Sequence, residues 1–327
     1  MTPRAVPVSV PGKLFVLGEY AILAGGPALV TTVDRHIRVR PRDKSDGYQV
    51  EGADLDDPLH LPMLIRRVLD TDEDIEIDAN ALTVDVGEFF HEETKLGFGS
   101  SAASTVAIVA STAPHLSAKR RFELAFDIHR RLQDGAGSGA DIAASIFGGP
   151  LAYRLASPQS PFDDIDLETD GTVRDEIETE IATIDKSPSF PPELRIDAVW
   201  TGQRASSVSF IDGVVDAMDR KPGEIAAKFT AIAEAARAGI RACRDGDADA
   251  FVDAVRAGDL GMEELGAATN LPIITDAHRR IRALAHTTHS VAKPSGAGGG
   301  DFTLLVGPAN APVPRPIEDQ YRVISVA

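Results

Sequence analysis

Cysteine, lysine and long apolar runs are all scarce in this sequence. Its single cysteine, Cys243, cannot form an intramolecular disulfide, which agrees with a reducing compartment. No stretch of about 18 uncharged apolar residues occurs, so we expect no membrane-spanning helix. The first residues also lack the basic and then apolar segment of a secretory signal. We therefore expect a cytoplasmic protein with no membrane partner.

Positive charge is scarcer than negative charge. The formal net charge is −17, and a field of that sign repels nucleic acid and anionic lipid, so we expect neither as a partner. An anionic substrate would need positive charge concentrated in its own pocket. Only eight residues are lysine, and three of them, Lys13, Lys95 and Lys293, lie in or beside glycine-containing segments. Because lysine is a common point-charge binder of phosphate, these three predict a small anionic substrate.

The chain has 327 residues, which is too long for one ordinary core and suits two packed domains. Strand-like and helical segments interleave without the regular rhythm of a doubly wound sheet. That pattern favours an α+β fold with largely antiparallel sheets. Residues 156–192 are rich in Asp, Glu, Pro and Ser and place the domain boundary near residue 190. The sequence therefore predicts domains of residues 1–190 and 191–327, in a monomer or a homodimer.

Hydrophobic periodicity assigns the elements. It predicts strands within residues 8–40, 74–86, 151–154, 194–201, 302–306 and 322–327. Helical spacing predicts helices at residues 59–70, 100–113, 118–133 and about 140–147, and three or four helices within residues 222–287. The polar residues 43–58 are expected to form a loop.

The segment Lys95-Leu-Gly-Phe-Gly-Ser-Ser-Ala-Ala carries the strongest chemical signal. Its glycines let the backbone approach an anion, and a helix begins directly after them, so free N–H groups and the helix dipole favour phosphate there. The Ser101 hydroxyl is a candidate ligand of Mg²⁺. A plain glycine-rich turn with a serine N-cap has the same pattern, and the segment is not a Walker loop. The candidate phosphate-binding residues are Lys95, Gly97, Gly99, Ser100, Ser101 and Ala102.

Three further segments are weaker in isolation. Lys13 follows Pro-Gly before a strand, a position that also suits a solvated turn lysine. Asp141, in Gly137-Ser-Gly-Ala-Asp, falls in the first turn of a helix, where the dipole keeps a carboxylate ionised. The run Lys293-Pro-Ser-Gly-Ala-Gly-Gly-Gly precedes an apolar strand, so both a linker and a close approach to a ligand are consistent with it.

Together, and in this order along the chain, the four segments resemble the motifs of the GHMP kinase superfamily. The family motif Pro-x-x-x-Gly-Leu-Gly-Ser-Ser-Ala is matched by residues 93–102, with Phe98 in place of Leu and without the proline. Five features resemble the phosphomevalonate kinase branch: Gly18-Glu-Tyr-Ala, Lys95 two residues before Gly97, Gly137-Ser-Gly-Ala-Asp-Ile-Ala-Ala-Ser, Trp200-Thr-Gly-Gln-Arg-Ala-Ser-Ser and Lys293-Pro-Ser-Gly-Ala-Gly-Gly-Gly-Asp.

The resemblance implies a two-domain fold, with an N-terminal domain similar to ribosomal S5 domain 2 and a ferredoxin-like C-terminal domain. It implies that ATP and Mg²⁺ bind with the phosphates over residues 97–103, while residues 293–301 close on the acceptor. Asp141 would orient the attacking oxygen and accept its proton, and Lys13 would stabilise charge on the transferred group. The implied acceptor-binding residues are Tyr20, Ser138, Gly139, Arg204, Lys293, Ser295, Gly296, Ala297 and Gly298.

Phosphomevalonate is the acceptor that this branch implies. Arg130, Arg131 and Arg204 are candidates to hold its charged groups, since arginine pairs with phosphate or carboxylate, although each also suits an ordinary surface position. Several alternatives stay open: a mevalonate kinase or another GHMP kinase, a diphosphomevalonate decarboxylase of the same superfamily, and a non-catalytic binding protein on this fold. The presence of both Lys13 and Asp141 argues against the last of these.

Overall fold

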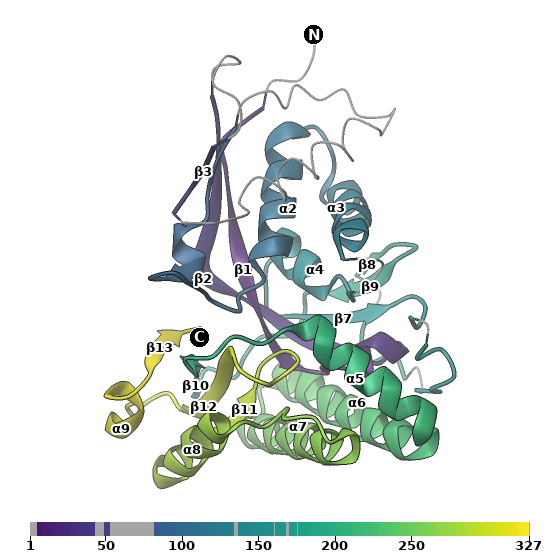
Figure 1. Ribbon diagram of the computed structural model, residues 1–327, viewed down its shortest axis with the longest axis vertical. Helices are drawn as coiled ribbons and strands as arrows, with labels where there is room; N and C mark the ends of the chain where they lie inside the picture. The colour runs from purple at the N-terminus through teal and green to yellow at the C-terminus, as the bar shows by residue number, and fades with distance from the viewer. Residues whose placement is uncertain are drawn as a thin grey trace. The chain divides into compact units, whose positions relative to one another are not determined.

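The computed structural model describes residues 5–42, 49–52, 82–133, 137–159, 161–167, 170–174 and 176–326. The chain forms two compact units, and Figure 1 shows their elements. The first unit combines Met1–Lys13 with Thr32–Gly148, and the second combines Leu14–Thr31 with Gly149–Ala327. This division differs from the one expected at residue 190, because residues 14–31 and 149–190 pack with the C-terminal part of the chain.

Two long strands at the N-terminal end pair with each other and run from one unit into the other: β1 (Val8–Leu17) and β2 (Ala28–Pro41). From Val10 to Val16 of β1, buried residues alternate with partly exposed ones, which is the predicted strand pattern. The remaining elements of the first unit are β3 (Gln49–Glu51), β4 (Leu82–Asp85), η3 (Gly87–Phe89), β5 (Phe90–His91), β6 (Thr94–Lys95), α2 (Ser100–Thr112), α3 (Ala118–Leu132) and α4 (Ala140–Phe147).

In the first unit, helix α2 packs against α3 and α4 (Figure 1). Helix α2 consists of small and β-branched residues and is buried along nearly its whole length, so it forms the centre of this unit. Helix α3 is amphipathic and buries Phe122, Ile128 and their neighbours, while the Ser117 side chain caps it by accepting from the Arg120 N–H at 3.2 Å. Strand β4 pairs antiparallel with the C-terminal half of β2 and parallel with β3.

The second unit holds two groups of strands and most of the helices. Strand β7 pairs antiparallel with β9 and with the first residues of β2, and β9 pairs with β8. Its elements are η1 (Ala21–Ala24), β7 (Leu151–Leu155), β8 (Ile177–Glu178), β9 (Ala182–Asp185), β10 (Leu194–Trp200), α5 (Ser207–Arg220), α6 (Pro222–Asp245), α7 (Ala248–Thr269), α8 (Asp276–Ala285), η4 (His286–Thr288), β11 (Val291–Pro294), β12 (Phe302–Pro308), α9 (Arg315–Glu318) and β13 (Arg322–Ser325).

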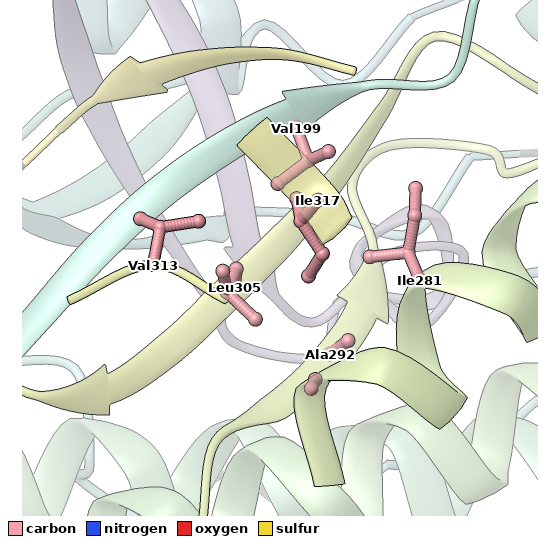
Figure 2. Close-up of a cluster of buried hydrophobic side chains, with 7 residues drawn as sticks. Val199, Ile281, Ala292, Leu305, Val313 and Ile317 are labelled. Atoms are coloured by element: carbon pink, nitrogen blue, oxygen red, sulfur yellow. The ribbon is translucent and has the colours of Figure 1, made fainter. Parts of the chain in front are cut away.

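The C-terminal part of this unit is an antiparallel sheet with strand order β11-β12-β10-β13. Figure 2 shows the cluster of buried side chains that joins this sheet to helices α8 and α9. The strands supply Val199, Leu305 and Ala292, and α8 supplies Ile281, so the helices cover one face of the sheet. Burial of this apolar surface fixes β11 and β12, which are the two strands that flank the last glycine run.

Most predicted elements are present, and the predicted α+β character is confirmed by helices together with largely antiparallel sheets. Residues 59–70 and most of 74–86 lie outside the described residues. The loop expected at 43–58 is wrong at Gln49–Glu51, which pairs with β4 as a short strand. Cys243 is a buried residue of α6, and burial raises the pKa of its thiol to about 12. In the described part of the chain, no helix combines the length and apolarity needed to cross a bilayer.

Candidate active site

Lys13 lies against the first glycine loop, residues 97–99, in the first unit. Its backbone N–H donates to the Phe98 carbonyl oxygen at 3.0 Å. Gly99 has φ of 73°, and a Cβ built there would lie 2.8 Å from the Lys13 Cε. Glycine is therefore required at this position both by the left-handed backbone and by the lysine chain that crosses it. The sequence places Lys13 and the loop 84 residues apart, and β1 brings them into contact.

The loop leads directly into helix α2, whose N-cap is Gly99 and has no side-chain cap. The first amides of such a helix lack intrahelical partners and form an anion site. Ser100 is buried and Ser101 is partly exposed. The Ser101 carbonyl accepts the Thr105 hydroxyl at 2.9 Å, and the Ser101 hydroxyl has no hydrogen-bond partner among the described residues. This hydroxyl is therefore available to a ligand or a metal ion.

The packed aromatic rings of Phe98 and Phe89 hold the first glycine loop in place. Phe98 is fully buried and meets Phe89 edge to face, with ring centroids 6.5 Å apart. The Phe89 ring also lies against Gly12, where a Cβ would be only 2.8 Å from its Cζ atom. Phe98, which replaces the leucine of the family motif, thus keeps the apolar anchor of the loop. Lys95 is partly exposed in the short hairpin of β5 and β6, two residues before Gly97.

Asp141 lies in the first turn of α4, after the left-handed N-cap Gly139. Its Oδ1 accepts from the Ile142 N–H at 3.0 Å, and the Ser138 hydroxyl accepts from the Ala140 N–H at 3.4 Å. One turn further along α4, the Ser145 hydroxyl donates to the Pro11 carbonyl oxygen at 3.0 Å.

The first unit thus gathers the predicted phosphate-binding and catalytic residues around one stretch of β1. Lys13 contacts the first glycine loop directly, and α4, which carries Asp141, is joined to Pro11 two residues before Lys13. Lys13 and Asp141 are both partly exposed. An ammonium, a carboxylate and an uncapped helix start on one scaffold suit the transfer of an anionic group.

In the second unit, strands β11 and β12 are joined by the second glycine loop, residues 295–300. The Ser295 hydroxyl donates to the Phe15 carbonyl oxygen at 2.8 Å, and the Gly299 N–H donates to the Ile273 carbonyl oxygen at 2.9 Å. Four of its glycines have positive φ, and they are Gly296, Gly298, Gly299 and Gly300. A Cβ at Gly299 would lie 2.1 Å from the Phe210 ring. The loop is therefore ordered by close packing.

Two residues predicted to bind the acceptor, Tyr20 and Lys293, are engaged with the protein itself. The Tyr20 hydroxyl donates to the Ala297 carbonyl oxygen at 2.6 Å, and burial, with the nearby Glu19 carboxylate, raises the pKa of this hydroxyl. Lys293 is fully buried, and its Nζ lies 2.5 Å from Glu19 Oε1 and 2.7 Å from the Pro294 carbonyl oxygen. In this conformation both side chains hold the loop, while the loop backbone remains for a ligand.

Arg204 is exposed and lies beside the second glycine loop. The Asp301 N–H donates to the Gln203 carbonyl oxygen at 2.7 Å, and Gly300 packs against the backbone of Gln203 and Arg204. The other two candidate arginines lie on α3. Arg131 pairs with Asp127 at 2.8 Å, and the Arg130 guanidinium lies 5.6 Å from the centre of the Phe126 ring. Of the three arginines, only Arg204 is placed next to a glycine loop by these contacts.

Sequence reasoning missed several charged groups of the second unit that are buried or partly buried. Glu19 is buried, and its Oε2 has no hydrogen-bond partner in the part of the chain that the structure describes. Arg282 of α8 reaches Asp259 and Glu263 of α7, each at 2.8 Å. Burial raises the pKa of Asp259, although Arg282 opposes that shift.

His278 is the second group that sequence reasoning missed. It is buried, and burial lowers its pKa to about 4. Its Nδ1 accepts from the Thr275 N–H at 3.1 Å, which completes a capping box at the start of α8. The available signal was Thr275-Asp-Ala-His, a capping-box spacing with His at the position where Glu is usual.

The described residues include no cluster of three or more His, Cys, Asp or Glu side chains suited to a metal ion. A divalent cation that arrives with an anionic substrate is held partly by the oxygen atoms of that substrate. The partly exposed Ser101 hydroxyl fits the role of a protein ligand to such a substrate-bound ion, because no described residue occupies it.

Comparison with known proteins gives consistent similarities. The family model for the GHMP kinases N terminal domain matches residues 73–149. The chain is similar to a phosphomevalonate kinase from Streptomyces sp. (strain CL190), with 30% identity over 94% of this chain and 91% of that protein. It is also similar to a mevalonate kinase from Aeropyrum pernix, with 31% identity over 46% of this chain and 51% of that protein.

Among solved structures, the chain is similar to the Streptococcus pneumoniae phosphomevalonate kinase in complex with phosphomevalonate and AMPPNP. The TM-score is 0.75 at 21% identity, and the alignment covers 96% of this chain and 95% of that one. This similarity spans both units and confirms the predicted fold class.

Proposed function

Because the chain belongs to the GHMP kinase family, we propose that it transfers the γ-phosphoryl group of ATP to phosphomevalonate. The observation that carries the proposal is the 30% identity to a phosphomevalonate kinase over 94% of the chain. The solved relative that binds phosphomevalonate and AMPPNP supports the same pair of substrates. The products would be ADP and diphosphomevalonate.

The first unit supplies the groups that ATP phosphates require. The N–H groups at the start of α2 and the Lys95 ammonium would bind the phosphates, and the Ser101 hydroxyl would help to hold Mg²⁺. When bound, Mg²⁺ would neutralise charge on the β- and γ-phosphates. Lys13, which crosses Gly99, would stabilise the charge that develops on the transferred group.

In the reaction, an oxygen of the acceptor phosphate would form a bond to the γ-phosphorus while the bond from that phosphorus to the ADP oxygen breaks. A phosphate monoester is already largely ionised at neutral pH, because its second pKa is about 6. Asp141 would therefore orient the attacking oxygen more than deprotonate it. Charge neutralisation by Lys13 would then be the larger contribution.

The second unit supplies groups suited to a doubly anionic acceptor. The backbone of Gly296 and Gly298 would bind the acceptor, and Lys293, Ser295 and Tyr20 would keep this backbone in place. The exposed Arg204 beside the loop would pair with a phosphate or carboxylate. Ser138 and Gly139, at the start of α4 in the first unit, remain proposed acceptor contacts.

The acceptor preference tests the proposal. We expect kcat/KM for phosphomevalonate to exceed that for mevalonate by about a hundredfold or more, because an arginine left without its phosphate partner is unfavourable. The measurement is release of ADP with each acceptor at matched ionic strength, with CO₂ followed separately. A preference for mevalonate, or release of CO₂, would contradict the proposed acceptor.

A variant of Arg204 tests whether this arginine causes the preference for phosphomevalonate over mevalonate. Arg204→Met should lower kcat/KM for phosphomevalonate by about tenfold or more and change that for mevalonate less, since it removes a charge-assisted hydrogen bond. Arg220→Met is the matched control, because Arg220 is an exposed arginine at the other end of α5. Equal losses for both acceptors would remove Arg204 from phosphate recognition.

A further inference from the structure

The turn that follows β1 has an unfavourable backbone. Gly18 has φ of 94°, and a Cβ there would lie 2.3 Å from the Pro27 carbonyl oxygen. Tyr20 has φ of 62° and ψ of −53°, a conformation that residues with a side chain rarely adopt. Such strain persists only where the surroundings determine the backbone, and it is concentrated at functional sites. The contacts that this turn makes therefore indicate its role in the protein.

Two adjacent residues of the turn reach the second glycine loop. The Tyr20 hydroxyl donates to the Ala297 carbonyl oxygen at 2.6 Å, in the middle of the loop. Glu19 Oε1 accepts from the Lys293 ammonium at 2.5 Å, and the same ammonium donates to the Pro294 carbonyl oxygen, directly before the loop. The turn thus fixes both the base and the middle of the loop.

The path of Lys293 shows that its pairing with Glu19 is specific. The side chain has no exposed surface and passes over Gly258 of α7, where a Cβ would lie 3.3 Å from the lysine Cε. Glycine in the interior of a helix lowers helix stability, and here it leaves room both for Leu17, whose Cδ2 would lie 2.6 Å from such a Cβ, and for the lysine. A buried ammonium without its carboxylate partner is strongly unfavourable. Glu19 therefore determines where Lys293, and with it the base of the loop, can lie.

We propose that Glu19 and Tyr20 are positioning residues that set the shape of the second glycine loop for the acceptor. The assignment of the acceptor to this loop rests on the proposed function. Neither side chain contacts the reacting groups in this proposal. The buried Lys293 side chain supports the loop through its contacts with Glu19 and the Pro294 carbonyl oxygen. The positive-φ glycines present their backbone to the ligand.

The first test measures loop shape without activity. Hydrogen exchange of the Gly299 and Asp301 amides, which donate to Ile273 and Gln203, reports on the loop directly. We expect Tyr20→Phe to speed exchange of these amides by about tenfold, the effect of one lost hydrogen bond. Tyr321→Phe is the matched control, since Tyr321 is a partly buried tyrosine that packs against the hydrophobic cluster of the same unit. Unchanged exchange in Tyr20→Phe would overturn the proposal.

The second test uses kinetics and the charge pair. Glu19→Gln should raise KM for phosphomevalonate by about tenfold and leave KM for ATP unchanged, whereas Glu264→Gln, which breaks the partly exposed Lys228–Glu264 pair, should change neither. The double variant Glu19→Gln with Lys293→Met removes the uncompensated charge and keeps the test valid if the single variant unfolds. The double variant should fold, but its KM for phosphomevalonate should remain raised.

Equal changes in the two KM values, or loss of amide protection throughout the unit, would show a merely structural role and overturn the proposal. Failure of the proposed function has a different signature. In that case the wild-type protein would not phosphorylate phosphomevalonate, while the exchange rates of the variants would still decide the role of Glu19 and Tyr20.

Discussion

The two glycine loops use the same kinds of residue in opposite ways. At the first loop, Lys13 crosses Gly99 and stays partly exposed, and the Ser101 hydroxyl has no hydrogen-bond partner among the described residues. At the second loop, Lys293 is fully buried against Glu19, and the Ser295 hydroxyl donates to Phe15. A lysine and a serine beside glycines thus stay partly exposed in one unit and support the backbone in the other.

The difference follows from the elements that each loop connects. The first loop ends at a helix start, where free amides already form an anion site and side chains can add to it. The second joins two antiparallel strands, whose ends supply no comparable group of amides. Its shape must therefore come from tertiary contacts, and its side chains are used to make them.

The largest expected effect lies in the first unit. Lys13→Met and Asp141→Asn should each lower kcat by about a hundredfold or more, because Lys13 would stabilise charge on the transferred group and Asp141 would orient the attacking oxygen. KM for ATP should change much less, and the double variant should be strongly non-additive in steady-state kinetics. Lys119→Met is the matched control, since Lys119 is an exposed lysine of α3 in the same unit. Near-wild-type kcat in either variant would exclude a central role for that residue.

A second effect concerns His278, which belongs to the capping box of α8 in the second unit. His278 has a pKa of about 4 in the folded protein, compared with 6.5 ordinarily, mainly because it is buried. Between these values the unfolded chain binds the proton more tightly, so stability falls as the pH falls from about 6.5 to 4. Protonation of Nδ1 would also remove the acceptor of the Thr275 N–H.

The linkage predicts that this histidine lowers the free energy of unfolding by about 2 kcal/mol between pH 7.5 and pH 5. The free energy of unfolding of His278→Gln, measured by urea denaturation, should not show this decrease between pH 7.5 and pH 5, even if the variant is less stable at pH 7.5. His286→Gln, at an exposed histidine eight residues along, should keep the wild-type pH dependence. An unchanged pH dependence in His278→Gln would show that the histidine does not titrate in this range.

The sequence predicted the first loop better than the second because its chemistry is local. Gly97, Gly99 and the two serines lie within residues 97–101, and a helix start can be inferred from their order alone. The role of Lys293 depends on Glu19, 274 positions away, and that of Tyr20 depends on Ala297, 277 positions away. No pattern within a short window contains those pairs.

The unit boundaries show the same limit. Composition placed a division near residue 190, but residues 14–31 pack with the C-terminal part of the chain. The strand pattern predicted for these residues is correct, but the part of the chain against which they pack is decided by tertiary contacts. Likewise, Thr275-Asp-Ala-His has the spacing of a capping box, but the burial that lowers the pKa of His278 is a tertiary property.

The smallest expected effects compare the two serines directly. Ser101→Ala should lower kcat/KM for ATP by about tenfold, since a hydrogen bond to a charged ligand is worth about 1.5–3 kcal/mol. The free energy of unfolding should stay unchanged, because no described residue bonds to this hydroxyl. Ser117→Ala is a useful reference in the same unit, since it removes the cap of α3 and should affect stability alone.

Ser295→Ala should show the opposite pattern. The bond from the Ser295 hydroxyl to the Phe15 carbonyl oxygen would be lost, so the free energy of unfolding should fall by about 1 kcal/mol, while KM for ATP stays unchanged. Urea denaturation and ATP kinetics should be measured for both serine variants. We expect Ser101→Ala to change only the ATP kinetics and Ser295→Ala to change only the free energy of unfolding. If Ser101→Ala were destabilised as much as Ser295→Ala, its hydroxyl would be structural. If Ser295→Ala instead raised KM for ATP with stability intact, the second loop would present side chains to the nucleotide, and the contrast between the loops would be wrong.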